Sequence, residues 1–194
     1  MIAIIDYKMG NLRSVENALK RLGAEFTVTA DADVIRSADR VLLPGVGNAA
    51  EAMENLRKAD LTQVIRSLRR PVLGICVGMQ VMCRHSEEGD CNCLNIFDSH
   101  VKRFVPTQEL KVPHMGWNKI SNLESKLFKG ISGGEYVYFV HSYYPELCTD
   151  TIATTTHGAM FSSALKYENF YGTQFHPEKS GDVGEKIIEN FLNL

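Results

Sequence analysis

The segment Pro71–Gln80 constrains the fold most, because its composition predicts a buried strand that turns directly into a helix. Its first half, Pro71–Ile75, is apolar and opens with a proline, which has no N–H to donate and can stand only at the start of a strand. Good helix formers without breakers follow from Gln80. The joint reads Gly74-x-Cys76-x-Gly78, which is the spacing of a nucleophile elbow with cysteine in place of serine.

An elbow of this kind gives Cys76 a chemical role. The sharp turn lifts the central side chain out of the sheet, and the flanking glycines leave room for neighbouring chain. The helix that follows directs N–H groups and its positive end at the site, which favours an anion there and offers donors to a developing oxyanion. The alternative is a small buried core residue, since free cysteines are commonly buried. The spacing alone leaves these two interpretations about even.

The first half of the chain alternates strands and helices. Apolar runs at 2–5, 41–43 and 72–75, and an alternating run at 25–29, predict strands. Helical periodicity covers about 12–22, with Gly23 as the capping residue, and about 49–69, with a break near Asp60. Residues 87–93 are expected to form a loop. Such alternation is typical of a parallel α/β sheet.

The second half is rich in short β-type runs, at 111–120, 135–144, 151–156 and 160–175. The chain ends in a predicted helix with one apolar stripe, made by Val183, Ile187, Ile188, Phe191 and Leu192. We therefore predict a single domain over 1–194, of α/β class, with a mostly parallel central sheet and extra antiparallel strands from the second half.

Composition excludes several classes of partner. With 44% hydrophobic and 23% charged residues and a formal net charge of −2, the chain gives no reason to expect nucleic acid or a membrane as its partner. No run approaches the ~18 apolar residues of a membrane-spanning helix, and the N-terminus does not resemble a signal peptide. Five cysteines, an odd number, suggest reduced thiols and a cytoplasmic location.

Three features could converge on Cys76. The first is Gln174-Phe-His-Pro-Glu178, in which an extended backbone would place His176 and Glu178 on one face, with Glu178 orienting the imidazole toward the thiol. Activity that depends on such a base is expected to fall as His176 protonates on acidification. A surface histidine with an acidic neighbour is the alternative for that pair alone.

The second feature is Pro44-Gly-Val-Gly47, directly after an apolar strand. Its glycines would let the Val46 N–H point inward, where it could form an oxyanion hole with the Val77 N–H. A plain β-to-α turn is equally consistent with this motif. The third feature is Gln80, one helical turn after Cys76, which could either bind an amide substrate or support helix packing.

Taken together, these motifs resemble one family. Gly74–Gln80 and Gln174–Glu178 are similar to the two signatures of the class I (triad) glutamine amidotransferases, whose fold is a flavodoxin-like three-layer sandwich. Lys111-Val-Pro-His-Met-Gly-Trp-Asn118 resembles the glutaminase subunits of imidazole glycerol phosphate synthase within that superfamily. The resemblance covers nearly the whole chain, including Asp6–Leu12, Ser86–Gly89, Phe139–Tyr143 and Pro177–Ser180.

The resemblance implies that glutamine is hydrolysed to glutamate and ammonia through a glutamyl thioester, without a cofactor or metal. Cys76 would be the nucleophile, His176 the proton shuttle and Glu178 its orienting partner, with the N–H groups of Val46 and Val77 forming the oxyanion hole. The residues expected to hold glutamine are Gly47, Gln80, Glu88, Ser142 and Tyr143.

The resemblance also implies a partner, with which the chain would form a heterodimer. This is the cyclase subunit, a (β/α)8 barrel that uses the ammonia to make imidazole glycerol phosphate and aminoimidazole carboxamide ribotide in histidine biosynthesis. In such families the glutaminase is nearly silent until the partner is bound and loaded. The expected docking residues are Asn11, Pro113, Met115, Trp117 and Lys179.

The sequence departs from the family pattern where Cys91-Asn-Cys93-Leu94 replaces a Gly-Leu-Gly-Leu-like stretch. Incidental reduced thiols are the favoured interpretation; a redox pair, or a metal site with Cys83 and His85, is a minor alternative because structural zinc sites prefer Cys-x2–4-Cys spacing. A glutaminase serving another synthase, a non-catalytic scaffold and a redox sensor on a related fold remain as rival functions. The Lys111–Asn118 motif and the complete Cys/His/Glu set argue against them.

Overall fold

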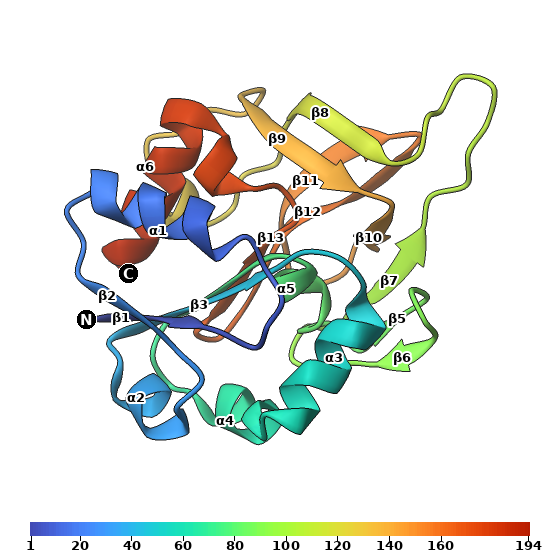
Figure 1. Ribbon diagram of the computed structural model, residues 1–194. Coiled ribbons are helices and arrows are strands. Elements are labelled where there is room, and N and C mark those ends of the chain that lie inside the picture. The colour runs from blue at the N-terminus through green and yellow to red at the C-terminus, as the bar shows by residue number, and fades with distance from the viewer.

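A seven-stranded sheet forms the centre of the protein in the computed structural model, which describes residues 1–194 (Figure 1). The strands lie in the order β11-β12-β13-β4-β3-β1-β2. All neighbouring pairs from β13 to β2 are parallel, and β12 runs opposite to both of its neighbours. The bounds are β1 Ile2–Ile5, β2 Phe26–Thr29, β3 Arg40–Gly45, β4 Val72–Cys76, β11 Thr151–His157, β12 Ala159–Tyr167 and β13 Phe170–Thr173.

Helices cover both faces of this sheet. Figure 1 shows α1 and α6 together on one side, and α2, α3 and α4 on the other. Their bounds are α1 Leu12–Arg21, α2 Ala32–Ser37, α3 Ala49–Lys58, α4 Leu61–Ser67, α5 Val77–Gln80 and α6 Gly181–Leu192. The predicted three-layer α/β sandwich with a mostly parallel sheet is therefore confirmed.

Local sequence explains most of the helix boundaries. The Asn11 side chain accepts the N–H of Ser14 at the start of α1, and Gly23 takes a left-handed φ of 65° just beyond its end. The predicted break between α3 and α4 falls at Asp60, whose φ is 55°. Helix α2 was not predicted. It buries only Ile35, so it leaves no apolar periodicity in the sequence.

The second half adds two small sheets. One has the order β10-β7-β5-β6, and the other is the antiparallel pair β8–β9. The predicted loop at 87–93 ends in the short strand β6, and the predicted run 160–175 divides at a turn where Glu168 has a φ of 49°. The remaining bounds are β5 His85–Ser86, β6 Cys91–Asn92, β7 His100–Arg103, β8 His114–Lys119, β9 Tyr136–His141, β10 Tyr143–Pro145, and the 3₁₀ helices η1 Lys126–Phe128 and η2 Pro177–Lys179.

One core connects both halves of the chain. A single cluster of 49 buried residues includes Ile4 and Leu42 from the first half and Phe161 and Phe191 from the second. This continuity matters for the site, because β4 from the first half lies directly beside β13 from the second. None of the helices combines the length and apolarity needed to cross a membrane.

Candidate active site

The strand β4 turns into the helix α5 at Cys76, as the elbow spacing predicts. Cys76 has φ 55° and ψ −113°, a region that side-chain-bearing residues rarely adopt and that costs of the order of 1–3 kcal/mol. Close approach of backbone explains the glycine at 78, because a Cβ there would collide with the Leu43 carbonyl. Gly45 at the end of β3 is similarly confined: a Cβ there would lie 2.6 Å from the Gly78 nitrogen.

His176 and Glu178 meet just beyond the end of β13. The Nδ1 of His176 lies 2.7 Å from Oε1 of Glu178, and each side chain is only 2% exposed. The expectation of an extended backbone is wrong here, because Pro177–Lys179 is a turn of 3₁₀ helix. The two side chains meet across this tight turn, which a proline at its first position favours.

The surroundings of His176 raise its pKa to about 10. Burial lowers the pKa, but the interactions of His176 with Cys76 and Glu178, hydrogen bonding before charge, together outweigh that effect. The Nε2 atom is buried without a hydrogen-bond partner in the resting protein. This shift favours the imidazolium at neutral pH and so opposes the expectation of a neutral base that is lost on acidification.

A cavity of about 170 Å³ lies over Cys76. Its walls come from the ends of β4 and β9, from the segments that follow β3, β4, β9 and β13, and from the loop between β5 and β6. Every residue predicted as nucleophile, proton shuttle, oxyanion hole or glutamine ligand lines it, and Glu178 stands behind His176. The lining residues are Val46, Gly47, Cys76, Val77, Gln80, Glu88, Val140, His141, Ser142, Tyr143 and His176. Of these, Val140 and His141 were not predicted.

Val46 and Val77, the two residues predicted to form the oxyanion hole with their backbone N–H groups, both line the cavity with Cys76. Val77 is the first residue of α5, where the leading N–H groups of a helix have no partner within the helix. Val46 follows directly after β3, and its N–H donates to no other backbone group. Both positions fit donors for an oxyanion formed at Cys76.

Gln80 is occupied within the protein rather than free for substrate. Its Nε2 donates to the Tyr143 carbonyl at 2.9 Å and to Oε1 of Gln174 at 2.8 Å, so only its carbonyl oxygen remains available. Gln174 is fully buried, and its Nε2 lies 3.7 Å from the Cys76 sulfur. Gln174 was missed as a site residue. The signal was its position two residues before His176, on the same side of an extended segment.

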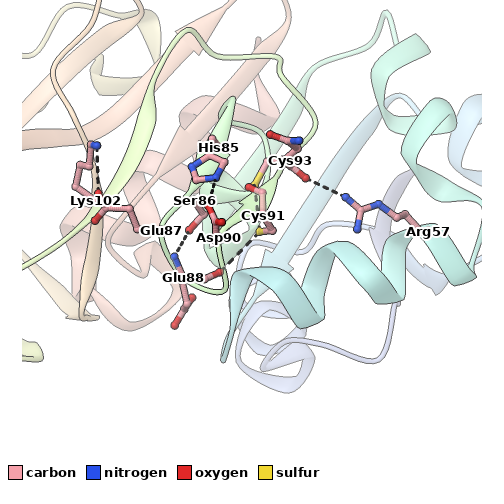
Figure 2. A network of polar contacts seen from close by, with 10 residues as sticks. Arg57, His85, Ser86, Glu87, Glu88, Asp90, Cys91, Cys93 and Lys102 are labelled. Atoms are coloured by element: carbon pink, nitrogen blue, oxygen red, sulfur yellow. Dashed lines mark hydrogen bonds and ion pairs between the residues drawn. The ribbon is translucent and has the colours of Figure 1, made fainter.

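The loop that carries Glu88 is tied to the segment after Val46. Oε2 of Glu88 accepts the N–H of Ala49 at 2.8 Å, at the start of α3, and Arg57 from α3 donates to the carbonyl of Asn92 in β6. Figure 2 shows the rest of this network, in which the Glu88 N–H donates to the Ser86 hydroxyl. Burial raises the pKa of Glu88. The loop therefore positions one wall of the cavity.

Cys91 and Cys93 lie on this loop with their sulfurs 3.9 Å apart (Figure 2). Burial raises the pKa of both thiols. Cys83 donates elsewhere, to the Met79 carbonyl, and His85 contacts Asp90. No group of three or more His, Cys, Asp or Glu residues has the arrangement of a metal site. Cysteine at 91 is accommodated by the β5–β6 pairing, in which it lies opposite Ser86.

The predicted docking residues lie around η2. Met115 and Trp117 are 64% and 55% exposed on β8, and Pro113 precedes them with an exposed ring. Exposed Asn11 stands before α1, and Lys179 is the last residue of η2. Both α1 and β9 pack against η2, so the elements that carry these residues are neighbours. Tyr136 on β9, 51% exposed, was not predicted and lies opposite Lys119 at the end of the same pair.

The family "Glutamine amidotransferase class-I" matches residues 3–194. Among solved structures, one described as a glutamine amidotransferase superposes with a TM-score of 0.76 at 16% identity, covering 100% of this chain and 98% of its own. A glutamine amidotransferase from Thermotoga maritima gives 0.64 at 18% identity, covering 99% and 82%. At these identities the structures show the fold, while the family match shows the class: the chain is a class I glutamine amidotransferase.

The sequence relatives are more specific. The imidazole glycerol phosphate synthase subunit HisH of Bacteroides thetaiotaomicron is 56% identical over 194 residues, covering 100% of this chain and 99% of the relative. Subunits of the same name from Bacteroides fragilis (strain NCTC 9343) and Idiomarina loihiensis are 57% and 45% identical, with 99% and 97% of each relative covered. The chain therefore belongs to the HisH family, as the Lys111–Asn118 motif predicts.

Proposed function

We propose that this chain hydrolyses glutamine through Cys76, His176 and Glu178 and delivers the ammonia to a cyclase partner. The observation that carries the proposal is the elbow sulfur in a small cavity beside a buried His–Glu pair. In the first step the Cys76 thiolate adds to the side-chain amide carbon of glutamine, and the amide oxygen becomes an oxyanion. The N–H groups of Val46 and Val77 stabilise that charge.

Collapse of this intermediate forms the thioester. The His176 imidazolium gives its Nε2 proton to the leaving nitrogen, so that ammonia departs and the imidazole becomes neutral. The imidazole then takes a proton from water, whose oxygen attacks the thioester carbonyl. The second intermediate expels the Cys76 thiolate and releases glutamate, restoring the imidazolium. Glu178 holds Nδ1 throughout and so keeps Nε2 directed at the reacting atoms.

The partner in this proposal is the (β/α)8 cyclase subunit of imidazole glycerol phosphate synthase. It would form a heterodimer with this chain and use the ammonia to make imidazole glycerol phosphate and aminoimidazole carboxamide ribotide. HisH relatives are named as subunits of that synthase. A cytoplasmic setting suits the five cysteines, none of which is in a disulfide.

The experiment that tests this function measures glutamate release from glutamine with and without the cyclase and its nucleotide ligand. We expect strong stimulation by the loaded partner, and its loss in Cys76→Ala. Equal rates with and without the partner would assign the glutaminase to another synthase. No turnover in either condition would leave only a binding protein on this fold.

Removal of the Trp117 ring should weaken the complex. The ring is half-exposed on β8 and packs edge-on against Tyr138 at 6.1 Å between centroids, so it offers a rigid aromatic anchor. We expect Trp117→Ala to raise the dissociation constant by about 30-fold, equivalent to about 2 kcal/mol. Isothermal titration against the cyclase measures it. Tyr167→Ala is the control, because Tyr167 is 47% exposed at the end of β12, beside the start of β4 and therefore away from the end of β4 that carries Cys76.

The raised pKa of His176 predicts its protonation state. Because the pKa is about 10, the resting protein at pH 8 should carry His176 as an imidazolium, and activity should be lost as the pH rises through about 10. NMR of ¹⁵N-labelled imidazoles reads this directly. Cys76→Ala removes one cause of the shift and should lower the pKa of His176. A neutral imidazole at pH 8 in the wild type would contradict the prediction.

A further inference from the structure

A run of buried and partly buried hydrogen bonds begins on β8, the strand that exposes Met115 and Trp117. The register of β8 and β9 places His114 directly opposite His141. Asn118 Nδ2 lies 3.1 Å from His114 Nε2, and His114 Nδ1 lies 2.9 Å from His141 Nε2. His141 Nδ1 in turn lies 2.7 Å from the Tyr143 carbonyl oxygen. We call Asn118, His114 and His141 the relay.

The contacts at both ends determine the direction of donation. The Asn118 amide is oriented by two backbone groups, since its Oδ1 accepts the Lys119 N–H at 2.8 Å and its Nδ2 donates to the Thr156 carbonyl at 3.0 Å. It therefore presents a donor to His114, whose Nε2 must be unprotonated and whose Nδ1 carries the hydrogen. At the other end the Tyr143 carbonyl can only accept, so His141 also carries its hydrogen on Nδ1. The two ends require the same tautomer.

The relay has no position for an additional proton. Each ring nitrogen of His114 and His141 is already used, one as a donor and one as an acceptor. Burial accordingly lowers the pKa of His114 to about 4 and that of His141 to about 3. His114 is further confined between the rings of Phe139 and His157, at 4.7 and 4.1 Å between centroids. A neutral, fully used and closely packed relay has one well-defined arrangement.

The same path reaches the nucleophile. The Tyr143 carbonyl also accepts from Gln80, which donates to Gln174, whose Nε2 contacts the Cys76 sulfur. Hydrogen bonds thus connect Asn118 on β8 to the reacting atom without interruption. Side chains alternate along β8: Met115 and Trp117 point outward, whereas His114 is buried. A partner that contacts the outer face and shifts β8 would therefore also move the relay residues.

We propose that Asn118, His114 and His141 are positioning residues that couple the outer face of β8 to the cavity wall at Tyr143 and to Cys76. The inference rests on the proposed function, in which the cyclase docks on Met115 and Trp117. Docking there changes the position of β8, and the relay passes that change to Gln80 and Gln174, which contact the site. Stimulation by the partner then depends on the intact relay.

The test variant is Asn118→Asp, which places a carboxylate where the amide donates. His114 must then be protonated on Nε2 and, to keep its bond to His141, on Nδ1 as well. We expect ¹⁵N NMR at pH 7 to show neutral Nδ1–H tautomers for both histidines in the wild type and an imidazolium at His114 in the variant. In complex with the cyclase, kcat for glutamate release should fall about tenfold, an ordinary coupling between two sites, with the dissociation constant nearly unchanged.

The matched control is Asn122→Asp. Asn122 donates to the Thr154 hydroxyl on β11, the strand that also accepts from Asn118, but contacts no histidine. It carries the same change of charge and should retain the kcat of the wild type. If Asn118→Asp fails to fold, His114→Gln and His114→Leu replace it. The glutamine amide can both donate and accept and should retain most of the stimulation, whereas leucine can do neither.

Three results would overturn the inference. Nε2–H tautomers in the wild type would exclude the relay as described. A stimulated wild type with an equally stimulated Asn118→Asp, or with His114→Leu equal to His114→Gln, would overturn the inference alone and leave the proposed function standing. A wild-type complex that releases no glutamate would remove the proposed function, and the coupling with it.

Discussion

Cys76→Ser should abolish glutamine hydrolysis in the presence of the loaded cyclase, with a loss of about four orders of magnitude or more. The substitution exchanges one atom, sulfur for oxygen, and leaves His176 and Glu178 in place. A serine hydroxyl is a far weaker nucleophile than a thiolate, and the imidazolium beside it cannot take its proton. Glutamate release at saturating glutamine measures the effect.

The serine variant should still bind the cyclase as the wild type does. Cys76 is 4% exposed, whereas the docking residues Met115 and Trp117 lie on the outer face of β8. A titration with the cyclase is therefore the control that separates chemistry from assembly. Turnover that persisted in the pure serine variant would remove Cys76 from the mechanism, even if His176 and Glu178 proved essential.

Gly78→Ala is the second change with a large expected effect, and it acts on folding. The added Cβ would collide with the Leu43 carbonyl oxygen and lie 2.9 Å from its carbon, and both atoms belong to the backbone of β3. Neither can move without disturbing the β3–β4 ladder. We expect the free energy of unfolding to fall by at least about 3 kcal/mol, the upper end of overpacking effects. Urea denaturation followed by circular dichroism measures it.

The control for the glycine variant is Gly133→Ala, since a Cβ at 133 would meet no heavy atom within 4 Å. Its effect should stay within about 0.5 kcal/mol of the wild type. A wild-type free energy of unfolding in Gly78→Ala would contradict the close approach of β3 and α5 at this position.

The layers of the fold were predictable because buried parallel strands leave continuous apolar runs. β1, β3 and β4 are each almost wholly buried, so these strands can be recognised from the local sequence alone. The region of the antiparallel strands in the second half was predicted to be β-rich, but the bounds of the individual strands were not predicted. The division between β12 and β13 depends on a left-handed Glu168, and nothing in the local composition requires it.

In the site, too, residues within short motifs could be predicted from the sequence, whereas contacts between distant parts of the chain could not. Cys76, His176 and Glu178 sit in short motifs whose spacing carries their chemistry. The contact of Gln174 with the sulfur instead depends on how far β13 extends beside β4, and the His114–His141 pair on the register of β8 with β9. Gln174 and Cys76 are 98 positions apart in the sequence, and His114 and His141 are 27 apart. No single motif therefore contains both partners of either contact.

The positive φ of Cys76 lowers the stability of the fold, while the proposed function requires a cysteine at this position. Glycine adopts such backbone angles freely, and cysteine does so only because β4, α5 and the surrounding core impose them. A library selected solely for resistance to unfolding would therefore tend to replace Cys76 with glycine. In the proposed function Cys76 is the nucleophile, so catalysis would keep cysteine at this position despite the strain at its backbone.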